Sequence, residues 1–294
     1  MIRLYAIAAL ALWGAATDAD AGAWTLPRGE FWGKLTYFRH STEEWYLGKG
    51  RFGTPGARVR YDFDGRYESS AAFIEEFYGL SDRLDLGVQI PYFDQSFANS
   101  TFAEPRGDAG LSDIRVYGKL RLIDQPLIFT LKTGAKMPTG EFKNEDGLIP
   151  VGEGQWDFDF VAQFGRSFWP LLLYANIDLG YRVRTHNAEI DRDPGDEWFL
   201  NAEVGYNLTR KLMLIGKCEI LRGDPAVVFG GIKAESKRIT YIMPVALYAI
   251  DDRSAVEAAL RISLNGRNYP AGRQWVETAV LRFGRALVAR VVVG

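Results

Sequence analysis

The sequence predicts an all-β protein, a transmembrane antiparallel β-barrel of about 12 strands with short periplasmic turns and longer extracellular loops. Three observations lead to this prediction. The N-terminus has the pattern of an export signal. Apolar and polar residues alternate through many segments, and the connections between these segments alternate between long and short.

The N-terminal segment sets the expected compartment. Arg3 precedes an uninterrupted apolar run over residues 4–13, and Ala19 and Ala21 form the small-x-small pattern that a signal peptidase reads. An apolar run of about ten residues is too short to cross a bilayer as a helix, although it also fits an apolar strand or core helix. We therefore expect residues 1–21 to be a signal peptide that is removed, and residues 22–294 to form a barrel in a Gram-negative outer membrane.

The composition excludes several classes of protein. The 294-residue chain has a net charge of −2, whereas nucleic-acid binding needs a concentrated basic surface, so we expect no nucleic-acid partner. Cys218 is the single cysteine, which allows no intrachain disulfide, and two distant histidines add no metal site or cofactor. Aromatic residues make up 14% of the chain, as in many membrane barrels. A soluble β-sandwich fits this composition almost as well, so the pattern along the chain decides.

Strict alternation is the decisive pattern. In the segment 113–122 the even positions are apolar or glycine, and the odd positions include four charged residues: Asp113, Arg115, Lys119 and Arg121. The same division into an apolar and a polar face recurs in the segments 156–164, 171–184, 198–207 and 256–264. The apolar faces tend to have an aromatic residue at one end and aliphatic residues between, as the aromatic girdles of a membrane barrel require.

The connections supply an independent argument. We expect twelve strands, near residues 30–40, 66–79, 82–93, 111–123, 126–137, 155–167, 170–184, 196–208, 211–222, 237–250, 253–265 and 274–283. The breaks alternate between long ones, at 41–65, 94–110, 138–154, 185–195, 223–236 and 266–273, and short ones, at 80–81, 124–125, 168–169, 209–210 and 251–252. An even number of strands, joined alternately by long loops and tight turns, is typical of outer-membrane barrels.

Two places fit this scheme less simply. In the strand 66–79, the adjacent Glu75 and Glu76 put one carboxylate on the lipid-facing side unless it lies near the membrane boundary. At the other end of the chain, we expect the barrel to close at Phe283. Residues 284–294 either pair as the true last strand or lie in the periplasm.

Several motifs resemble a known family. The segment 76–88, followed by Ile90, Pro91 and Tyr92, resembles the turn-centred motif of the putative MetA-pathway of phenol degradation family. GLSDIRVYGKLRL at 110–122, GAKMPTGEF at 134–142 and GEGQWDFDF at 152–160 are similar to the family's next features, in the same order. The resemblance covers most of the chain after residue 21 and implies an outer-membrane barrel. Because the family is named from operons for degrading aromatic compounds, it also implies aromatic or hydrophobic compounds as solutes.

The polar faces supply the candidate site. We expect these charged side chains to line the pore: Arg115, Lys119, Arg121, Lys132, Asp157, Asp159, Asp178, Arg182, Glu203, Lys217, Glu257 and Arg261. Arg115, Lys119, Asp157 and Asp159 lie on neighbouring or near-neighbouring strands and are the first candidates for a charged girdle. Such a mixed set either lines a water-filled channel or cross-links and plugs a narrow barrel through salt bridges. The loop between Pro138 and Gly154 is either a constriction or an ordinary external loop.

The function expected from these features is an outer-membrane channel or transporter for small solutes. Its partners would be outer-membrane lipid and lipopolysaccharide, a small-molecule solute, and the barrel-assembly machinery during biogenesis. An alternative is a structural or interaction barrel, accessory to export of a surface polymer or to envelope assembly, that binds its partner through the loop 41–65. A surface hydrolase is a third interpretation, based on His40, His186, Asp191 and Asp193 near strand ends. Because no histidine-serine motif of such hydrolases is present, we expect no enzymatic activity and no catalytic residue.

Overall fold

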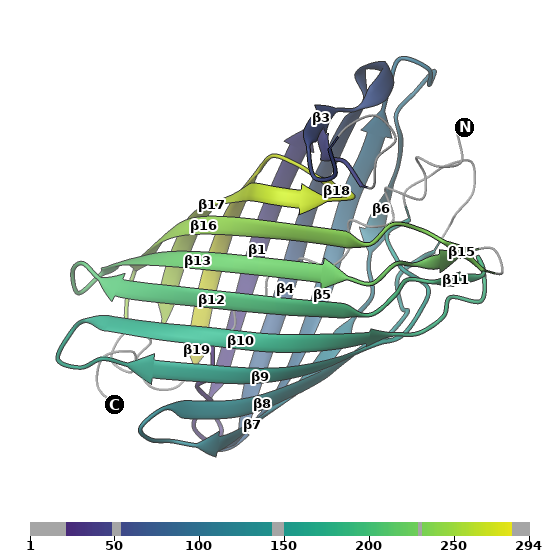
Figure 1. Ribbon diagram of the computed structural model, residues 1–294. Coiled ribbons are helices and arrows are strands. Elements are labelled where there is room, and N and C mark those ends of the chain that lie inside the picture. Colours follow the sequence, from purple (N-terminus) through teal and green to yellow (C-terminus); the bar gives the residue numbers. More distant parts are fainter. Residues whose placement is uncertain (1–21, 49–53, 143–149, 229–230, 284–294) are drawn as a thin grey trace.

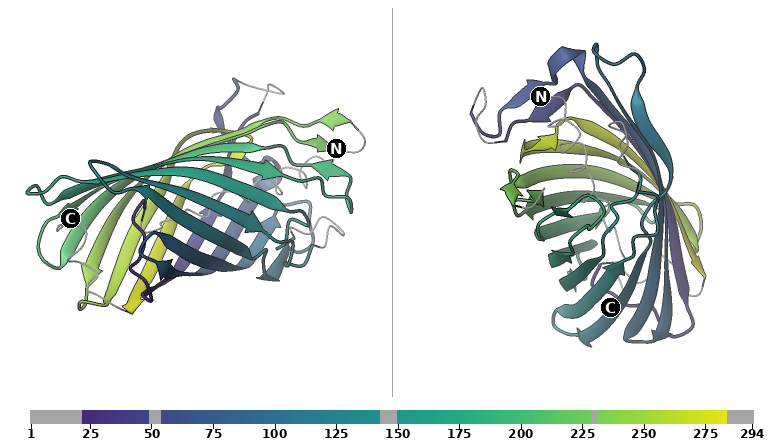
Figure 2. Two further views of the ribbon diagram at one scale, coloured as in Figure 1. Left: turned by 90° about the horizontal axis from the view of Figure 1, so that it is seen from below. Right: turned by 90° about the vertical axis from the view of Figure 1, so that its right-hand side faces the viewer.

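Twelve long strands close into one antiparallel barrel in the computed structural model, which describes residues 22–48, 54–142, 150–228 and 231–283 (Figure 1). The barrel strands are β1 (Phe31–Thr42), β4 (Arg66–Ser81), β5 (Leu84–Ala98), β7 (Arg115–Ile123), β8 (Ile128–Lys136), β9 (Asp157–Ser167), β10 (Leu173–Arg184), β12 (Glu197–Asn207), β13 (Leu212–Gly223), β16 (Lys237–Ala249), β17 (Ser254–Arg267) and β19 (Arg273–Phe283). Pairing of β1 with β19 and of β4 with β5 completes the ring. Figure 2 shows the strands inclined to one another as they wrap around a single interior.

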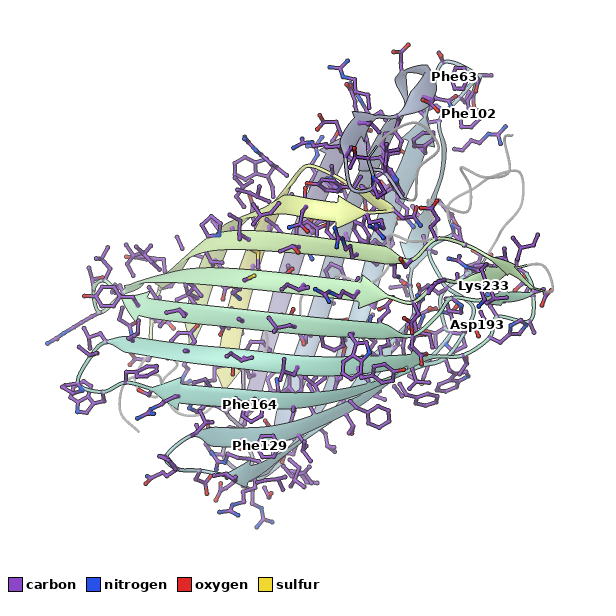
Figure 3. The ribbon with its side chains drawn as sticks, in the orientation of Figure 1. Phe63, Phe102, Phe129, Phe164, Asp193 and Lys233 are labelled. Atoms are coloured by element: carbon purple, nitrogen blue, oxygen red, sulfur yellow. The ribbon has the colours of Figure 1, made fainter. Side chains whose placement is uncertain are left out.

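The two ends of the barrel differ. The end with tight connections, here called the turn end, is where β1 begins and β19 ends, with Phe31 paired to Phe283. The opposite end, here called the loop end, has two small sheets, which lie beyond the barrel strands in Figure 1. One consists of β18 (Tyr269–Pro270), β2 (Glu44–Tyr46) and β3 (Arg58–Arg60), and the other of β11 (Arg192–Asp193), β14 (Val227–Val228) and β15 (Ile232–Lys233). In Figure 3, Asp193 and Lys233 mark the second small sheet.

The twelve strands predicted from alternation are all present, and the largest difference is at the loop end. The predicted strand 82–93 and part of the predicted loop 94–110 form β5 and β6 (Arg106–Leu111), which pair from Tyr92 with Leu111 to Phe97 with Arg106. The outward-facing residues Asp94 and Ser96 are polar. The alternation of apolar and polar residues therefore ends while the hydrogen-bonded ladder continues, because pairing needs backbone groups only.

Outward-facing side chains form an apolar belt. Leucines of adjacent strands, such as Leu120 and Leu131, expose more than 40% of their surface to the outside. Phe129 and Phe164 lie side by side on the outer surface of β8 and β9 (Figure 3), with ring centroids 5.0 Å apart. A continuous apolar belt of this kind is stable when lipid, rather than water, surrounds the barrel. Among the described residues, no helix is long and apolar enough to cross a membrane.

Inward-facing side chains are not uniformly polar, which corrects the expectation of a polar interior. Met213 and Ile215 of β13 and Met243 and Val245 of β16 point inward and are 3–7% exposed. The adjacent glutamates divide as the alternation requires, since Glu75 is fully buried and its Oε2 lies 2.7 Å from Lys34 Nζ, while Glu76 is partly exposed. The interior therefore has both charged and apolar regions.

Candidate functional site

A stretch of chain outside the strands occupies the barrel interior near the turn end. Residues 22–26 precede β1, and Ala23 and Leu26 are 0% and 5% exposed. The segment returns to the turn end through residues 27–30, where Gly29 N–H donates to Gly79 O and Gly79 N–H donates to Glu30 O. We call residues 22–26 the inner segment. Nothing in the alternation pattern predicted its position.

Side chains from four strands hold the inner segment by its backbone. Lys119 Nζ on β7 donates to Gly22 O at 2.8 Å and to Trp24 O at 3.1 Å. Asp85 on β5 accepts the Leu26 N–H at 3.0 Å, Asn176 of β10 accepts the Ala23 N–H, and the Thr130 hydroxyl of β8 donates to Ala23 O. Because these hydrogen bonds join wall side chains to the backbone of the segment, the segment is held against the wall without being part of the barrel ladder.

Apolar contacts complete the seat of the inner segment. The ring of Trp24 packs edge-on against Tyr174, with centroids 5.9 Å apart. Leu26 belongs to a cluster of buried residues from strands β1, β4, β7, β17 and β19: Trp32, Phe77, Tyr117, Ala255 and Val280. The apolar interior residues Met213, Ile215, Met243 and Val245 adjoin Trp24. Burial of these side chains adds a hydrophobic contribution to the hydrogen bonds that hold the segment.

A balanced network of ion pairs covers one wall toward the loop end. Arg182 lies 2.6 Å from Asp159 and 3.0 Å from Glu197, and Arg184 also contacts Glu197. The network contains equal numbers of cations and carboxylates, namely Arg115, Lys136, Arg182, Arg184 and Lys237 with Asp113, Glu153, Asp157, Asp159 and Glu197. Since each charge is compensated by a neighbour, removing one partner leaves an unpaired buried charge, which costs about 3–5 kcal/mol.

The described ends of the loop between β8 and β9 turn into the barrel and join this network. Val151 is 1% exposed, and Gln95 Nε2 of β5 donates to Pro150 O at 3.0 Å. Burial opposes ionisation of Glu153, but Arg184 and Lys136 outweigh it and hold the pKa of its carboxyl well below the ordinary value. The described ends of the loop therefore lie against the inner wall, and its role as a constriction stays a prediction. Residues 143–149 of the same loop lie outside the described residues.

Sequence comparison places the chain in a family. The family model described as "Putative MetA-pathway of phenol degradation" matches residues 48–275. The chain belongs to this family. The match includes the segments 76–92, 110–122, 134–142 and 152–160, on which the resemblance rests. No curated protein is significantly similar in sequence.

Solved structures with the same fold include a channel from Pseudomonas putida F1. The COG4313 outer membrane channel of that organism is 18% identical, with a TM-score of 0.73 over 89% of this family member and 98% of the channel. The Ralstonia pickettii toluene transporter TbuX is 8% identical, with a TM-score of 0.43 over 88% and 90% of the two chains. The translocator domain of the autotransporter NalP from Neisseria meningitidis is 9% identical, with a TM-score of 0.48 over 88% and 90%. The first similarity establishes the fold, whereas the last two scores are too low to carry an argument.

The predicted pore residues of this family member fall into three groups. Arg115, Asp157, Asp159 and Arg182 belong to the network of ion pairs described above. Lys119 and Lys132 lie at the inner segment and its aromatic cluster. The remaining residues lie elsewhere along the interior or its rim: Asp178 beside Gln163, Lys217 beside Glu203, Arg261 beside Glu219, Glu257 on β17, and Arg121 at the turn end beside Asp124.

Sequence reasoning missed the apolar and aromatic parts of the interior. One signal was available, because residues 239–249 of β16 read as a nearly continuous apolar run, which indicates a strand with two apolar faces. The inner segment had a weaker signal in the apolar residues Trp24 and Leu26, within five residues of the expected cleavage position.

The histidines considered for catalysis lie apart. His40 is 3% exposed inside the barrel, where its ring contacts Ala271 O and Gln274, while the His186 side chain is half exposed near Asp191. In the loop 41–65, Tyr46 points into the barrel and its hydroxyl donates to Ser263 O at 3.2 Å. The described part of that loop is therefore anchored to the barrel and does not form a free flap.

Proposed function

We propose that the protein is an outer-membrane channel that passes small solutes, among them aromatic or hydrophobic compounds, and that it is exported through the signal peptide 1–21. One observation carries the proposal: the barrel interior accommodates the inner segment, a separate stretch of chain with the indole ring of Trp24. An interior that holds an extended peptide and an indole has room for a single-ring solute once that segment moves.

The way the inner segment is held supports its role as a closure. Backbone hydrogen bonds to side chains, and not a strand ladder, attach it to the wall, so its release breaks a few bonds without opening the barrel. Such local openings cost far less than unfolding and occur on microsecond to second timescales. The apolar residues beside Trp24 would then face the emptied interior, which suits sparingly soluble compounds.

The proposal is tested by single-channel conductance of the refolded protein in planar bilayers. We expect stepwise currents from the wild type. In the Asp157→Asn/Asp159→Asn double variant we expect a shift toward anion preference, because two negative charges are removed from the wall while Lys136 and Arg182, which each lose one of their carboxylate partners, stay positive. Asp124→Asn, at the exposed turn, serves as the control.

Two outcomes contradict the proposal. A silent barrel that keeps its heat-modifiable gel mobility is folded but does not conduct. Currents with identical ion preference in the wild type and the double variant contradict the assignment of Asp157 and Asp159 to the conducting path.

Export is tested separately by the mass of the protein in the outer-membrane fraction. We expect the mature chain to begin at Gly22, because Ala19 and Ala21 precede the cleavage position. Recovery of the intact chain beginning at Met1 would contradict the proposed signal peptide.

A further inference from the structure

Two aromatic rings lie flat on the interior wall because glycines occupy the positions opposite them. In register, Phe77 of β4 pairs with Gly87 of β5, Gly87 pairs with Tyr117 of β7, and Tyr117 pairs with Gly134 of β8. A Cβ added at Gly87 would lie 2.4 Å from the Phe77 ring, and one at Gly134 would lie 2.6 Å from the Tyr117 ring. The two rings are inclined by only 24°, with centroids 6.2 Å apart. They form a nearly flat aromatic surface on the wall.

Two lysines stand over this surface. Lys132 Nζ lies 4.0 Å from the Tyr117 ring centroid and 5.6 Å from that of Phe77, and Lys119 Nζ lies 5.4 Å from the Phe77 centroid. Both lysines are at most 2% exposed. Ammonium groups beside buried aromatic rings combine a hydrophobic surface with positive charge, which is the combination that recognises an aromatic anion.

The inner segment imitates such an anion. Its two carbonyl oxygens, from Gly22 and Trp24, accept hydrogen bonds from Lys119 as the two oxygens of one carboxylate would. Its Leu26 side chain packs against Phe77 and Tyr117, where the ring of a solute would lie. The segment therefore supplies both halves of the ligand, the acceptor oxygens and the apolar group, from its own chain.

We propose that this wall, here called the lysine–aromatic site and formed by Phe77, Tyr117, Lys119 and Lys132, binds aromatic carboxylates in place of the inner segment. The inference rests on the proposed function, since the solute reaches the site through the channel. The carboxylate takes the positions of the carbonyl oxygens at Lys119, and the ring takes the position of the Leu26 side chain. Binding and displacement of the segment are then coupled, because both use the same groups.

The local charges favour an anion. Asp85 is the cross-strand neighbour of Lys119, and Lys119 is in turn the neighbour of Lys132, so two ammonium groups and one carboxylate stand beside the aromatic rings. The carboxylate of Asp159 also acts on Lys132, but it is paired with Arg115 and Arg182. Lys34 is nearby but is paired to Glu75 at 2.7 Å and adds no net charge. A neutral aromatic compound would gain only the contacts with the two aromatic rings. An aliphatic carboxylate would gain only the attraction to the two lysines.

The test is isothermal titration of the folded full-length protein in detergent micelles with sodium benzoate, sodium cyclohexanecarboxylate and benzyl alcohol, with empty micelles as the blank. We expect saturable binding of benzoate and weaker binding of the other two compounds. Lys119→Met/Lys132→Met should weaken benzoate binding at least tenfold, whereas Lys217→Met, another interior lysine, should change it less than twofold. Leu26→Ala, which loosens the competing segment, should tighten it.

The outcomes separate this inference from the proposed function. The lysine–aromatic site is overturned if neither the wild type nor Leu26→Ala binds benzoate saturably. It is also overturned if Lys217→Met weakens benzoate binding as much as Lys119→Met/Lys132→Met does. A channel that conducts but shows either result retains the proposed function and loses the lysine–aromatic site. Heat-modifiable gel mobility reports folding of each variant. If the double variant does not fold, the single Lys119→Met variant decides, with at least a threefold loss expected.

Discussion

Loosening the inner segment should open the channel without unfolding the barrel. Leu26 is 5% exposed and packs against Trp32, Phe77 and Tyr117, so Leu26→Ala removes buried contacts from the seated segment only. Leucine-to-alanine changes in packed interiors cost about 2–5 kcal/mol, and we take the lower end, about 2 kcal/mol, because a segment outside the strand ladder can shift into the space that the side chain leaves. Since about 1.4 kcal/mol corresponds to a factor of ten, the ratio of displaced to seated segment should rise about thirtyfold.

Single-channel recording in planar bilayers measures this ratio as the open probability. Leu221→Ala is the matched control, because Leu221 is equally buried but packs in a separate cluster near the loop end. We expect a large rise in the open probability for Leu26→Ala and little change for Leu221→Ala. An unchanged open probability in a Leu26→Ala barrel that keeps its heat-modifiable gel mobility would refute the reasoning. A similar rise in both variants would indicate a general loosening of the wall.

Two further predictions concern the wall itself. Gly134→Ala should lower the unfolding free energy by about 1–3 kcal/mol in urea titrations, because the new Cβ meets the Tyr117 ring, whereas Gly118→Ala, with no atom within 4 Å, should not lower it. Glu197→Gln should cost about 3–5 kcal/mol in the same assay because three buried cations lose their shared partner. Glu44→Gln, which breaks a partly exposed pair with an arginine, should cost at most about 1 kcal/mol, and equal losses for the two glutamates would contradict the assignment.

The interior has three regions, the network of ion pairs, the inner segment and the lysine–aromatic site, and each has a different role in the proposed function. The network of ion pairs at the loop end is internally compensated, so it contributes rigidity and little net charge. In the proposed function the inner segment closes the turn end, and the lysine–aromatic site lies on the wall that contacts it. A solute that enters at the loop end would therefore first meet a wall of paired charges with little net charge. It would then reach the lysine–aromatic site beside the inner segment.

Much of the fold could be predicted from the sequence because a barrel strand is a local pattern. Alternation over 113–122 assigns Arg115 and Lys119 to the interior and Leu120 to the lipid side without any knowledge of neighbouring strands. Strand number and the order of long and short connections followed in the same way. The pattern became unreliable only at the loop end, where β5 and β6 leave the apolar belt but continue to pair.

The arrangement of the interior depended on tertiary structure. The sequence by itself determined which side chains face inward, since that needs only a period of two. It did not determine that Asp159 would meet Arg182 and Arg115, which depends on the register between strands. Nor did it determine that residues 22–26 would fill the interior, because they have no repeating pattern and their position is set by contacts with strands more than fifty residues away. Local periodicity specified the wall, and only closure of the barrel decided what the wall encloses.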